Sequence, residues 1–558
     1  MLLKKEGKEM RNAIKGIIIF VITVAGIFAL NNISDAKQKI LTTENGTKLV
    51  CDTFDGDYYY VEDIINQQGE LKIPATVDGK HPITELSLQE SDKTYEKVTH
   101  IHFSYNMVNI QEGDMELGND SNAFSMFPNL TAVTIDKRND TYSFRNGKVY
   151  KGKKLVAVLP GMTGKVKIEK SDVKITRDAI LNLNKVTEFE VETGNKKYKS
   201  QDGVLYTKSG KTLVQYPLAK GNMKFNIPKG VKVIERQAFE KAVFLQTVAM
   251  PSTLRRIEEF AFQYSGLKKV YLNKKLEILG EGCFKDTKLT SITFPHGLRK
   301  AEIASIPVKK LIIPKTLGEI MYIHADDEKE DIVHAEKLII KNPMLDIREL
   351  ESTAKLFGKS GILRGKTIYA YKGSVPYRQI KKYAKKGKVK LKVIKGRNYY
   401  KIPKSTGRID TSWYSKKKSK FYISTPAQLA GLSKLSQKHN FWDKKIILKK
   451  NLNMKNYKNF CPIVNFHGTF NGNGKKITNL KIFRLSPYNG LFGNVEMGEV
   501  KNLKVYGKVT GGNYTGGIVG VLHDSRMKNC TFKGKVTGYG YSGKICGANW
   551  SSVITNKK

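Results

Sequence analysis

Two histidines two residues apart, His100 and His102, come nearest to a metal site by residue type and spacing. Alternate residues of a strand point to the same face, so both imidazoles would leave one strand together, and neutral ring nitrogens can bind a metal ion. Two ligands are too few to define a site, and a pair of solvated histidines on a sheet is the competing interpretation. We therefore predict no metal and no cofactor, and keep the pair as candidate ligand-contact residues.

Cations near an aromatic ring form a second set of candidates. Lys269 and Tyr271 stand two residues apart, and an amphipathic ring beside a cation is common where proteins recognise other molecules. Lys310 and Lys337 occupy comparable outward positions on later segments. We group these four residues with the two histidines as one candidate ligand surface. Ordinary solvated positions are the alternative interpretation.

A basic segment with interleaved tyrosines, residues 359–420, is the candidate for polyanion binding. It contains 21 Lys and Arg and a single acid, Asp410. Cations neutralise phosphate groups, and aromatic rings stack on bases. The residues that we predict to bind an anionic polymer are Lys381, Lys382, Lys385, Lys386, Lys388, Arg397, Lys416, Lys417 and Lys418. A solvated linker is the alternative, because charge runs commonly serve only solubility.

The positive charge of the chain is concentrated toward its C-terminal end. The 558 residues carry 97 Lys and Arg against 51 Asp and Glu, a formal net charge of +46. Residues 359–420 contribute +20 and residues 421–558 contribute +18, which leaves +8 for the first 358 residues. Such a charge attracts nucleic acid, anionic membranes or acidic glycopolymers alike. With 40% hydrophobic residues the chain can bury a core, so disorder throughout is excluded.

Residues for hydrolytic chemistry are scarce in the C-terminal part of the chain. Glycoside cleavage typically uses a pair of carboxyl groups that flank the bond. Residues 421–558 contain only four acids, Asp443, Glu496, Glu499 and Asp524. The sequence also lacks HExxH, GxSxG and P-loop motifs. We therefore expect a protein without catalytic activity.

The N-terminal 36 residues predict export from the cell. Five cations precede an apolar run at residues 17–30, and Ser34 and Ala36 supply the small residues that a signal peptidase requires. Cleavage after Ala36 would leave no membrane span, and an uncleaved signal anchor is the alternative. Five cysteines without a CxxC pair indicate buried free thiols. These features favour a secreted or surface-associated protein of a bacterium, which we expect to be Gram-positive.

The elements that must position these residues follow from a repeat with a period near 22. Its markers, Ile227, Met250, Leu272, Phe294 and Ile313, are 23, 22, 22 and 19 residues apart. One short parallel strand per unit, stacked on the next, describes a leucine-rich-repeat solenoid. The expected strands are residues 98–103, 130–135, 186–191, 245–250, 267–272, 289–294, 308–313 and 335–340.

These units share further residues. An Ala-Phe dipeptide recurs at 238–239 and 261–262, Phe284 keeps the same register, and strands end before Pro251 and Pro314. Segment 198–217 interrupts the array, and segment 142–160 is a weaker copy of it. The units resemble the BspA-like leucine-rich repeats of bacterial surface proteins over roughly residues 41–394, with departures at 303–306 and 318–346. The resemblance implies a solenoid on a bacterial surface that binds without catalysis.

A second repeat, with a period of 27, ends the chain. The segments NGLFG, GGIVG and GKICG finish at Gly493, Gly520 and Gly547, and Asn502 matches Asn529 at the same spacing. Short β segments with Gly or Asn corners at a constant period are typical of a parallel β-helix. This region resembles the GLUG repeat of bacterial surface proteins over roughly residues 413–556.

We predict a mainly β repeat protein in which a leucine-rich-repeat solenoid is followed by a short parallel β-helix. The expected parts are a signal peptide at 1–36, a BspA-like solenoid at 41–394, a basic linker at 395–420 and a GLUG-like β-helix at 421–558.

The expected function is non-catalytic binding or adhesion by a secreted or cell-surface protein. Its partners would be a host or bacterial surface protein or glycan and, at the basic part, an anionic polymer: teichoic acid, a sulfated or sialylated glycan, or extracellular DNA. Two alternatives stay open. One is a carbohydrate-active β-helix lyase or hydrolase that acts on an acidic polysaccharide, and the other is a structural wall component without a specific ligand.

Overall fold

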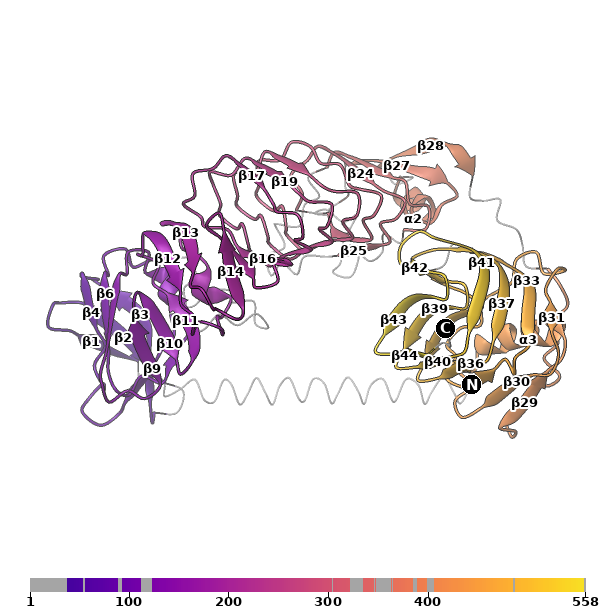
Figure 1. The fold of residues 1–558 in the computed structure, drawn as a ribbon, viewed down its shortest axis with the longest axis horizontal. Coiled ribbons are helices and arrows are strands. Elements are labelled where there is room, and N and C mark those ends of the chain that lie inside the picture. Colours follow the sequence, from indigo (N-terminus) through magenta and orange to yellow (C-terminus); the bar gives the residue numbers. More distant parts are fainter. Residues whose placement is uncertain are drawn as a thin grey trace. The chain divides into compact units, whose positions relative to one another are not determined.

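The computed structural model has a mainly β fold built from stacked short strands (Figure 1). It describes residues 38–53, 56–88, 93–111, 123–303, 305–321, 335–345, 347, 363, 365–384, 389–398, 406–484 and 487–555. The predicted signal peptide, residues 1–36, lies outside this described part. No helix among the described residues combines the length and the apolar composition that crossing a bilayer requires.

The chain divides into two compact units. Unit 1 comprises Met1–Lys208 and Pro217–Lys220, and unit 2 comprises Ser209–Tyr216 and Gly221–Lys558. Unit 1 therefore holds the early, degenerate repeats, and unit 2 holds the regular repeats and the C-terminal β-helix. The domain limits predicted at residues 394 and 420 stay predictions.

Two sheets in the first part of unit 1 stack consecutive turns of the chain. In the first, β1, β2 and β3 pair antiparallel, and β3, β5 and β7 pair parallel. The second has the parallel order β4-β6-β8. The bounds are β1 Lys39–Thr42, β2 Lys48–Asp52, β3 Tyr59–Ile65, β4 Glu70–Lys72, β5 Ile83–Leu86, β6 His100–Phe103, β7 Asn109–Ile110 and β8 Ala132–Ile135.

The sheet β4-β6-β8 shows why its strands form as they do. Leu71, Ile101 and Val133 stand opposite one another in register and are buried. Because successive side chains of a strand alternate between faces, the residues beside Ile101 must point outward. His100 and His102 therefore share the outer face, as their spacing predicted.

The remainder of unit 1 contains antiparallel segments and one further pair of parallel strands. Segment 142–160 forms the meander β9-β10-β11, β12 and β13 pair parallel, and β14 and β15 form a hairpin. The bounds are β9 Tyr142–Arg145, β10 Lys148–Lys151, β11 Lys154–Val158, β12 Gly164–Ile168, β13 Val186–Val191, β14 Tyr198–Gln201 and β15 Val204–Thr207, with short 3-10 helices η1 Ala123–Met126 and η2 Asp178–Ile180.

The repeat array of unit 2 has two rows of parallel strands, visible in Figure 1 with β17, β19 and β24 in one row and β16 and β25 in the other. The first row pairs β17-β19-β21 and then, after a break, β24-β26-β27-β28. The bounds are β16 Thr212–Gln215, β17 Lys224–Asn226, β18 Val233–Ile234, β19 Thr247–Ala249, β20 Arg256–Ile257, β21 Lys269–Tyr271, β22 Ile278–Leu279, β23 Lys300–Glu302, β24 Lys310–Ile313, β25 Glu319–Met321, β26 Lys337–Ile340, β27 Thr367–Lys372 and β28 Lys390–Asn398, with helix α2 at Val375–Ala384.

Seven of the eight strands expected from the period near 22 are present, and one is wrong. Residues 289–294 form no strand, although Leu289 and Phe294 are buried as the pattern requires. The failure coincides with the shortening of the repeat from 22 to 19 residues after Phe294. The opposite row still pairs across this shorter unit, because Lys300 of β23 stands opposite Glu319 of β25, so the missing strand interrupts only one row. The second row of strands, which includes β18, β20 and β22, was not predicted, although its buried residues Ile234, Ile257 and Leu279 are also 23 and 22 residues apart.

The C-terminal part of unit 2 is a parallel β-helix, which confirms the predicted fold class. Its strand orders are β29-β30-β32-β36-β40-β44, β31-β33-β37-β41, β34-β38-β42 and β35-β39-β43. The bounds are β29 Lys420–Ile423, β30 Lys445–Leu448, β31 Leu452–Asn453, β32 Thr469–Asn471, β33 Lys476–Phe483, β34 Tyr488–Asn489, β35 Phe492–Glu496, β36 Glu499–Lys501, β37 Lys504–Gly511, β38 Tyr514–Gly516, β39 Val519–His523, β40 Arg526–Lys528, β41 Thr531–Gly538, β42 Ser542–Gly543, β43 Cys546–Trp550 and β44 Val553–Thr555. Helix α3, Pro426–Ser436, starts with a capping box made by Thr425 and Gln428.

The corners of the β-helix explain its 27-residue period. Asn502 and Asn529 adopt φ values of 51° and 52°, in the left-handed region that Asn tolerates. Their amides form a ladder, because Asn529 Nδ2 donates to Asn502 Oδ1 at 3.2 Å and Asn502 Nδ2 donates to Asn471 Oδ1 at 3.3 Å. Gly534, at φ 144°, needs glycine because a Cβ there would overlap the carbonyl oxygen of Gly507 on the previous coil. The repeated residues therefore keep consecutive coils in register.

Candidate functional site

A column of three lysines runs across the β-helix on strands β33, β37 and β41. Lys481 stands opposite Lys508, and Lys508 stands opposite Lys535. All three side chains are exposed, and neighbouring strands of a sheet are about 4.8 Å apart. We call Lys481, Lys508 and Lys535 the lysine ladder. It places three positive charges in a straight line at the spacing of the coils.

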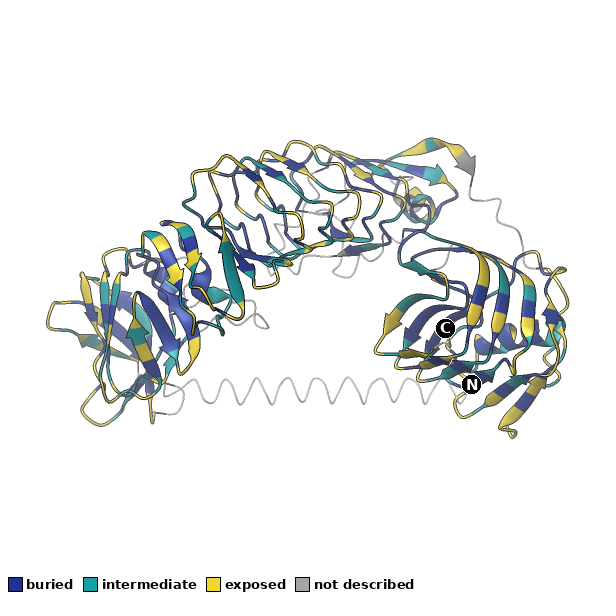
Figure 2. Ribbon diagram, in the orientation of Figure 1, coloured by how far each residue is buried: buried dark blue, intermediate teal, exposed yellow. Residues whose placement is uncertain are grey.

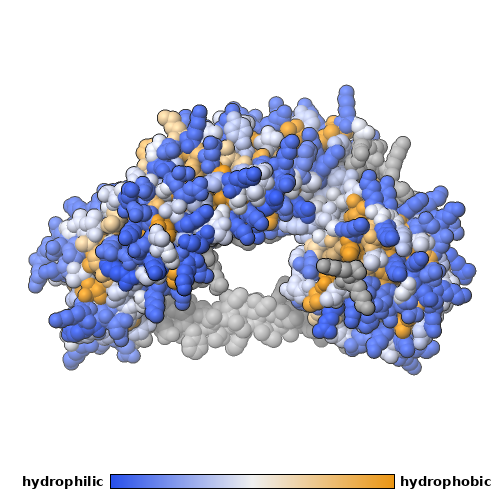
Figure 3. All heavy atoms as spheres, viewed as in Figure 1, coloured by the Kyte–Doolittle hydropathy of each residue, from blue (hydrophilic) through white to orange (hydrophobic). Residues whose placement is uncertain are grey.

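The surroundings of the lysine ladder are basic as well. The sequences of β33, β37 and β41 contain no Asp or Glu, and three more exposed lysines, Lys476, Lys504 and Lys533, lie on them. Figure 2 shows the alternation of buried and exposed positions along these strands, and Figure 3 shows mostly hydrophilic residues on the face of the β-helix turned toward the viewer. Like charges directly opposite each other destabilise a sheet. An anionic ligand would relieve that repulsion.

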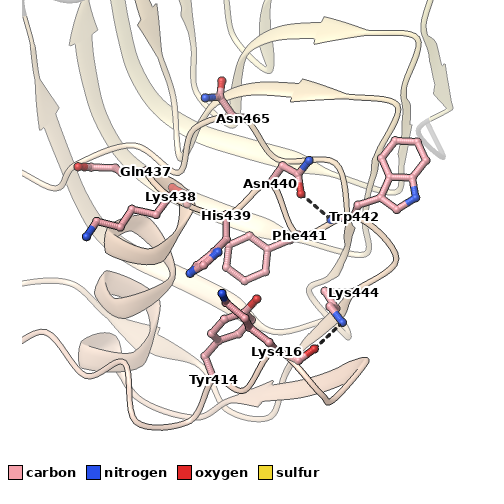
Figure 4. A pocket seen from close by; sticks show the side chains of 11 residues that line it. Tyr414, Lys416, Gln437, Lys438, His439, Asn440, Phe441, Trp442, Lys444 and Asn465 are labelled. Atoms are coloured by element: carbon pink, nitrogen blue, oxygen red, sulfur yellow. Dashed lines mark hydrogen bonds between the residues drawn. The ribbon is translucent and has the colours of Figure 1, made fainter. Parts of the chain in front are cut away.

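A basic and aromatic pocket of about 540 Å³ lies near the start of the β-helix (Figure 4). Its described lining includes three lysines and no acid; the lysines are Lys416, Lys438 and Lys444. Lys444 Nζ donates to the carbonyl oxygen of Lys416 at 3.1 Å, which ties the turn before β29 to the coil that follows. The aromatic lining comprises Tyr414, His439, Phe441 and Trp442.

Three rings of this pocket pack together, and the fourth, Trp442, lies 5.9 Å from the ring of His467. Tyr414 packs against His439 and Phe441, each with a centroid distance of 5.3 Å. Trp442 is 49% exposed, and its indole points away from the three packed rings (Figure 4). A flat exposed indole next to lysines can stack on a sugar or base while the cations meet its anionic group.

The residues predicted for polyanion binding are only partly placed by the structure. Lys416, Lys417 and Lys418 are exposed in the segment before β29, and Lys381 is exposed on α2. Lys385, Lys386 and Lys388 lie outside the described residues, as do the side chains of Lys382 and Arg397. Of the nine, Lys416 lines the basic and aromatic pocket.

The candidate ligand surface is divided between the units. His100 and His102 belong to unit 1, and the other four residues belong to unit 2. In unit 2, Lys269 Nζ lies 5.1 Å from the ring centroid of Tyr271, which is 53% exposed, and Lys310 stands opposite Lys337 in register. The structure thus forms two small pairs from these four residues.

The histidine pair has a third neighbour that the sequence did not reveal. The rings of His100 and His102 stack at a centroid distance of 4.0 Å. Glu70, on the adjacent strand β4, has its Oε2 3.7 Å from His102 Nε2. Desolvation, with the nearby His100 as a further cause, lowers the pKa of His102 and so favours its neutral form.

Acids of the β-helix gather at one cleft despite their small number. Asp443, Glu499 and Asp524 line a cleft of about 510 Å³ together with His467 and Arg526. Glu496 is close to two histidines. Its Oε2 is 3.7 Å from His467 Nε2, and its Oε1 is 3.6 Å from His523 Nδ1. Glu499 Oε2 is 2.5 Å from Lys501 Nζ.

The buried cysteines are unsuited to nucleophilic chemistry. All five are free. Cys51, Cys283 and Cys530 are buried, and burial raises the pKa of the Cys51 thiol to about 12 and that of the Cys530 thiol to about 11. A raised pKa keeps a thiol protonated and unreactive near neutral pH.

The lysine ladder and the basic and aromatic pocket were missed by the sequence reasoning in different ways. Lys508 and Lys535 are 27 residues apart, which is the period of the repeat. Applying that period to the outward-facing residues, as well as to the buried ones, would have found the ladder. The pocket left no such signal, because Lys416 and Lys444 meet only when β29 and β30 stack.

Comparison with known families supports both resemblances. Residues 220–322 match the family model for the BspA type leucine rich repeat region in six copies, and residues 511–537 match the model for the GLUG motif. A comparison with curated proteins finds no match.

Solved structures of bacterial leucine-rich proteins are also similar in part. The pneumococcal vaccine antigen PcpA is 16% identical with a TM-score of 0.34, over 65% of this chain and 100% of that one. A leucine rich cell surface protein from Faecalibacterium prausnitzii is 14% identical with a TM-score of 0.31, over 55% and 96% of the two chains. A leucine-rich repeat protein from Eubacterium ventriosum is 15% identical with a TM-score of 0.29, over 49% and 88%. From the family matches, the chain carries a BspA-type leucine-rich repeat region followed by a GLUG motif.

Proposed function

We propose that this is a secreted or cell-surface binding protein of a Gram-positive bacterium that holds an anionic polymer on the basic face of its β-helix without catalysis. The observation that carries the proposal is the lysine ladder: Lys481, Lys508 and Lys535 stand in register and exposed on strands that contain no acid. The BspA-type repeats supply a long solenoid surface for a second, protein or glycan partner.

The spacing of the lysine ladder selects among polyanions. Charges about 4.8 Å apart are best neutralised by a polymer whose anionic groups follow one another closely. Teichoic acid, heparin-like sulfated glycans and nucleic acid meet this condition, whereas a glycan with one terminal sialic acid would engage a single lysine. We therefore favour a phosphate-rich or sulfate-rich polymer, and we place its chain across the coils of the β-helix.

The test compares two variants that lose the same charge at different places. Lys481, Lys508 and Lys535 are changed to Gln in one variant, and the exposed Lys196, Lys229 and Lys274 are changed to Gln in the control. Binding to purified wall teichoic acid, heparin and duplex DNA is measured from low to high salt. The ladder variant is expected to bind at least tenfold more weakly and with a smaller salt slope, while the control stays near wild type.

Three results would reject the proposal. Equal losses in both variants would show that net charge alone matters, and retention that does not fall with salt would remove the electrostatic mechanism. No binding to any of the three polymers at low salt would favour a structural wall component without a specific ligand.

A carbohydrate-active enzyme is the second candidate, because Asp443, Glu499 and Asp524 converge on one cleft. Such an enzyme would need one of these carboxyl groups as an acid or base near a bound sugar. The assay incubates the protein with polygalacturonate and hyaluronate and measures reducing ends and unsaturated products. Turnover that is abolished in Glu499→Gln or Asp524→Asn would establish this candidate, and no product from either polymer would remove it for these substrates.

A further inference from the structure

The sheet β4-β6-β8 of unit 1 assembles three metal-ligand side chains on its outer face. In the parallel register Glu70 stands opposite His100, and Lys72 stands opposite His102. Ligand atoms of Glu70, His100 and His102 all lie within 4.8 Å of one another. His102 Nε2 and Glu70 Oε2 lie 3.7 Å apart. Among the described residues this is the one group of three such side chains that comes so close.

The types of these ligands suit one class of metal ion. Two imidazoles and one carboxylate are a common ligand set for Zn²⁺, which binds nitrogen and oxygen at about 2.0–2.2 Å and keeps a further position for water or another ligand. Ca²⁺ and Mg²⁺ prefer sets made entirely of oxygen atoms. Tetrahedral ligands around Zn²⁺ are roughly 3.3 Å apart at these bond lengths. The His102–Glu70 distance of 3.7 Å is close to this value, whereas the stacked rings of His100 and His102 must rotate so that an in-plane nitrogen of each faces the ion.

An unpartnered atom points to a ligand independently of the cluster. His102 Nε2 is buried and has no hydrogen-bond partner among the described residues, although the imidazole as a whole is partly exposed. A buried polar atom without a partner is unfavourable, and native proteins usually satisfy it with protein, water or an ion. A metal ion between His102 and Glu70 would satisfy it.

The neighbouring residues orient the group and limit the repulsion of an incoming cation. His100 Nε2 and the Thr134 hydroxyl on β8 are hydrogen-bonded at 2.7 Å, and such outer contacts hold the ring of a metal-binding histidine in place. Lys72 is the cation nearest in register, and its Nζ is drawn toward Glu44 Oε2 at 3.3 Å. The stacked rings also hold the two histidines together before any ion arrives.

We propose that Glu70, His100 and His102 form a binding site for a divalent transition-metal ion, Zn²⁺ first among them, on the outer face of unit 1. The ion would clip strand β4 to strand β6 and keep at least one coordination position open to solvent. This site lies in unit 1 and does not depend on the polyanion surface proposed for the β-helix.

The first experiment measures Zn²⁺ binding to the full chain after treatment with a chelator. Titration calorimetry with zinc chloride, and metal analysis after dialysis, should give one tightly bound Zn²⁺ that the triple variant Glu70→Gln, His100→Ala, His102→Ala loses. Each single variant should bind at least tenfold more weakly. The matched control, His296→Ala, removes an exposed histidine of unit 2 and should bind as the wild type does.

Two further measurements keep the result clear if a variant folds poorly. Co²⁺ bound at the site should produce visible absorption bands typical of a low coordination number. These bands should vanish in Glu70→Gln, a variant that keeps both histidines. Saturating Zn²⁺ should raise the thermal midpoint of the wild type and leave that of the triple variant unchanged, because the ion binds only the folded site. Unchanged Zn²⁺ stoichiometry in the triple variant, or no binding by the wild type, would overturn the proposal.

Discussion

Lys148 of unit 1 is a charged side chain that folding buries almost completely, with 2% of its surface exposed. Its Nζ donates to Asp172 Oδ2 at 2.9 Å, to Glu169 Oε1 at 3.1 Å and to the carbonyl oxygen of Lys167 at 2.9 Å. The Tyr150 hydroxyl donates to Asp172 Oδ1 at 2.9 Å. Burial of charge is tolerated here because each ammonium proton has an acceptor and the nearby carboxylates carry opposite charge.

Replacing Lys148 by Met should destabilise unit 1 by about 3 kcal/mol, because the buried Asp172 carboxylate would lose its main counter-ion. Lys153→Met, at an exposed position on the neighbouring turn, should change stability by less than about 0.5 kcal/mol. Urea unfolding followed by far-UV circular dichroism measures both. The three tryptophans lie at 413, 442 and 550 in unit 2, so their fluorescence serves as an internal control. Equal midpoints for the two variants would contradict this account.

The same cluster predicts how unit 1 responds to acid. A hydrogen bond from Asn146, followed by the contact with Lys148, lowers the pKa of Glu169 below its usual value of 4.5. The unfolded chain therefore binds a proton at higher pH than the folded one, so this stabilisation is complete above about pH 4.5 and is lost as the pH falls through the folded-state value. Urea midpoints measured from pH 7 to pH 3 should fall less steeply in Glu169→Gln. An identical slope would exclude this contribution.

At the scale of elements, an aromatic column joins the regular repeats of unit 2. Phe239, Phe262 and Phe284, which share one register in the sequence, stack with centroid distances of 4.6 Å and 5.6 Å. All three are fully buried. Because each coil of a solenoid contacts only its neighbours, such a column transmits stability from one repeat to the next.

Removing the middle ring should therefore unfold more than one repeat. Phe262→Ala should cost about 3–5 kcal/mol and lower amide protection on β19 and β21 together, because the cavity opens between two coils. Phe244→Ala, at a position that is 53% exposed, is the control and should leave protection unchanged. Hydrogen exchange read by mass spectrometry tests both. Loss of protection confined to a single repeat would argue against coupling through the column.

At the scale of the whole molecule, net charge is distributed unevenly between the leucine-rich region and the C-terminal part. The first 358 residues carry a net charge of +8, and the last 200 carry +38. The polyanion attraction that we propose would therefore come from the C-terminal part, and recognition of a partner by the leucine-rich region would rest on shape and individual side chains.

A bound polyanion should consequently protect only one region. With saturating heparin, amide exchange is expected to slow on β33, β37 and β41 and to remain unchanged in unit 1, because a ligand stabilises the structure that it binds. The variant without the lysine ladder should show no slowing. Equal protection in both units would point to nonspecific attraction by the whole chain.

Much of the architecture could be predicted because each repeat unit shows the same spacing of buried residues. The strands at 98–103, 186–191 and 245–250, the phenylalanine register and the asparagine corners all follow from local alternation and constant spacing. The strand expected at 289–294 did not form, although Phe294 keeps the 22-residue spacing from Leu272, which shows that a constant period does not by itself ensure a strand. Inward and outward faces followed from the same alternation.

The residues that face each other on neighbouring strands could not be predicted from local periodicity. Glu70 and His100 are thirty residues apart in a degenerate part of the array, where no constant period states which residues lie opposite each other. Lys148 meets Asp172, and Lys416 meets Lys444, through equally irregular connections. The amino-acid order alone thus determined the repeats and their faces, because these depend on local periodicity. Only the folded structure decided which side chains share a site, because that depends on the register between strands distant in sequence.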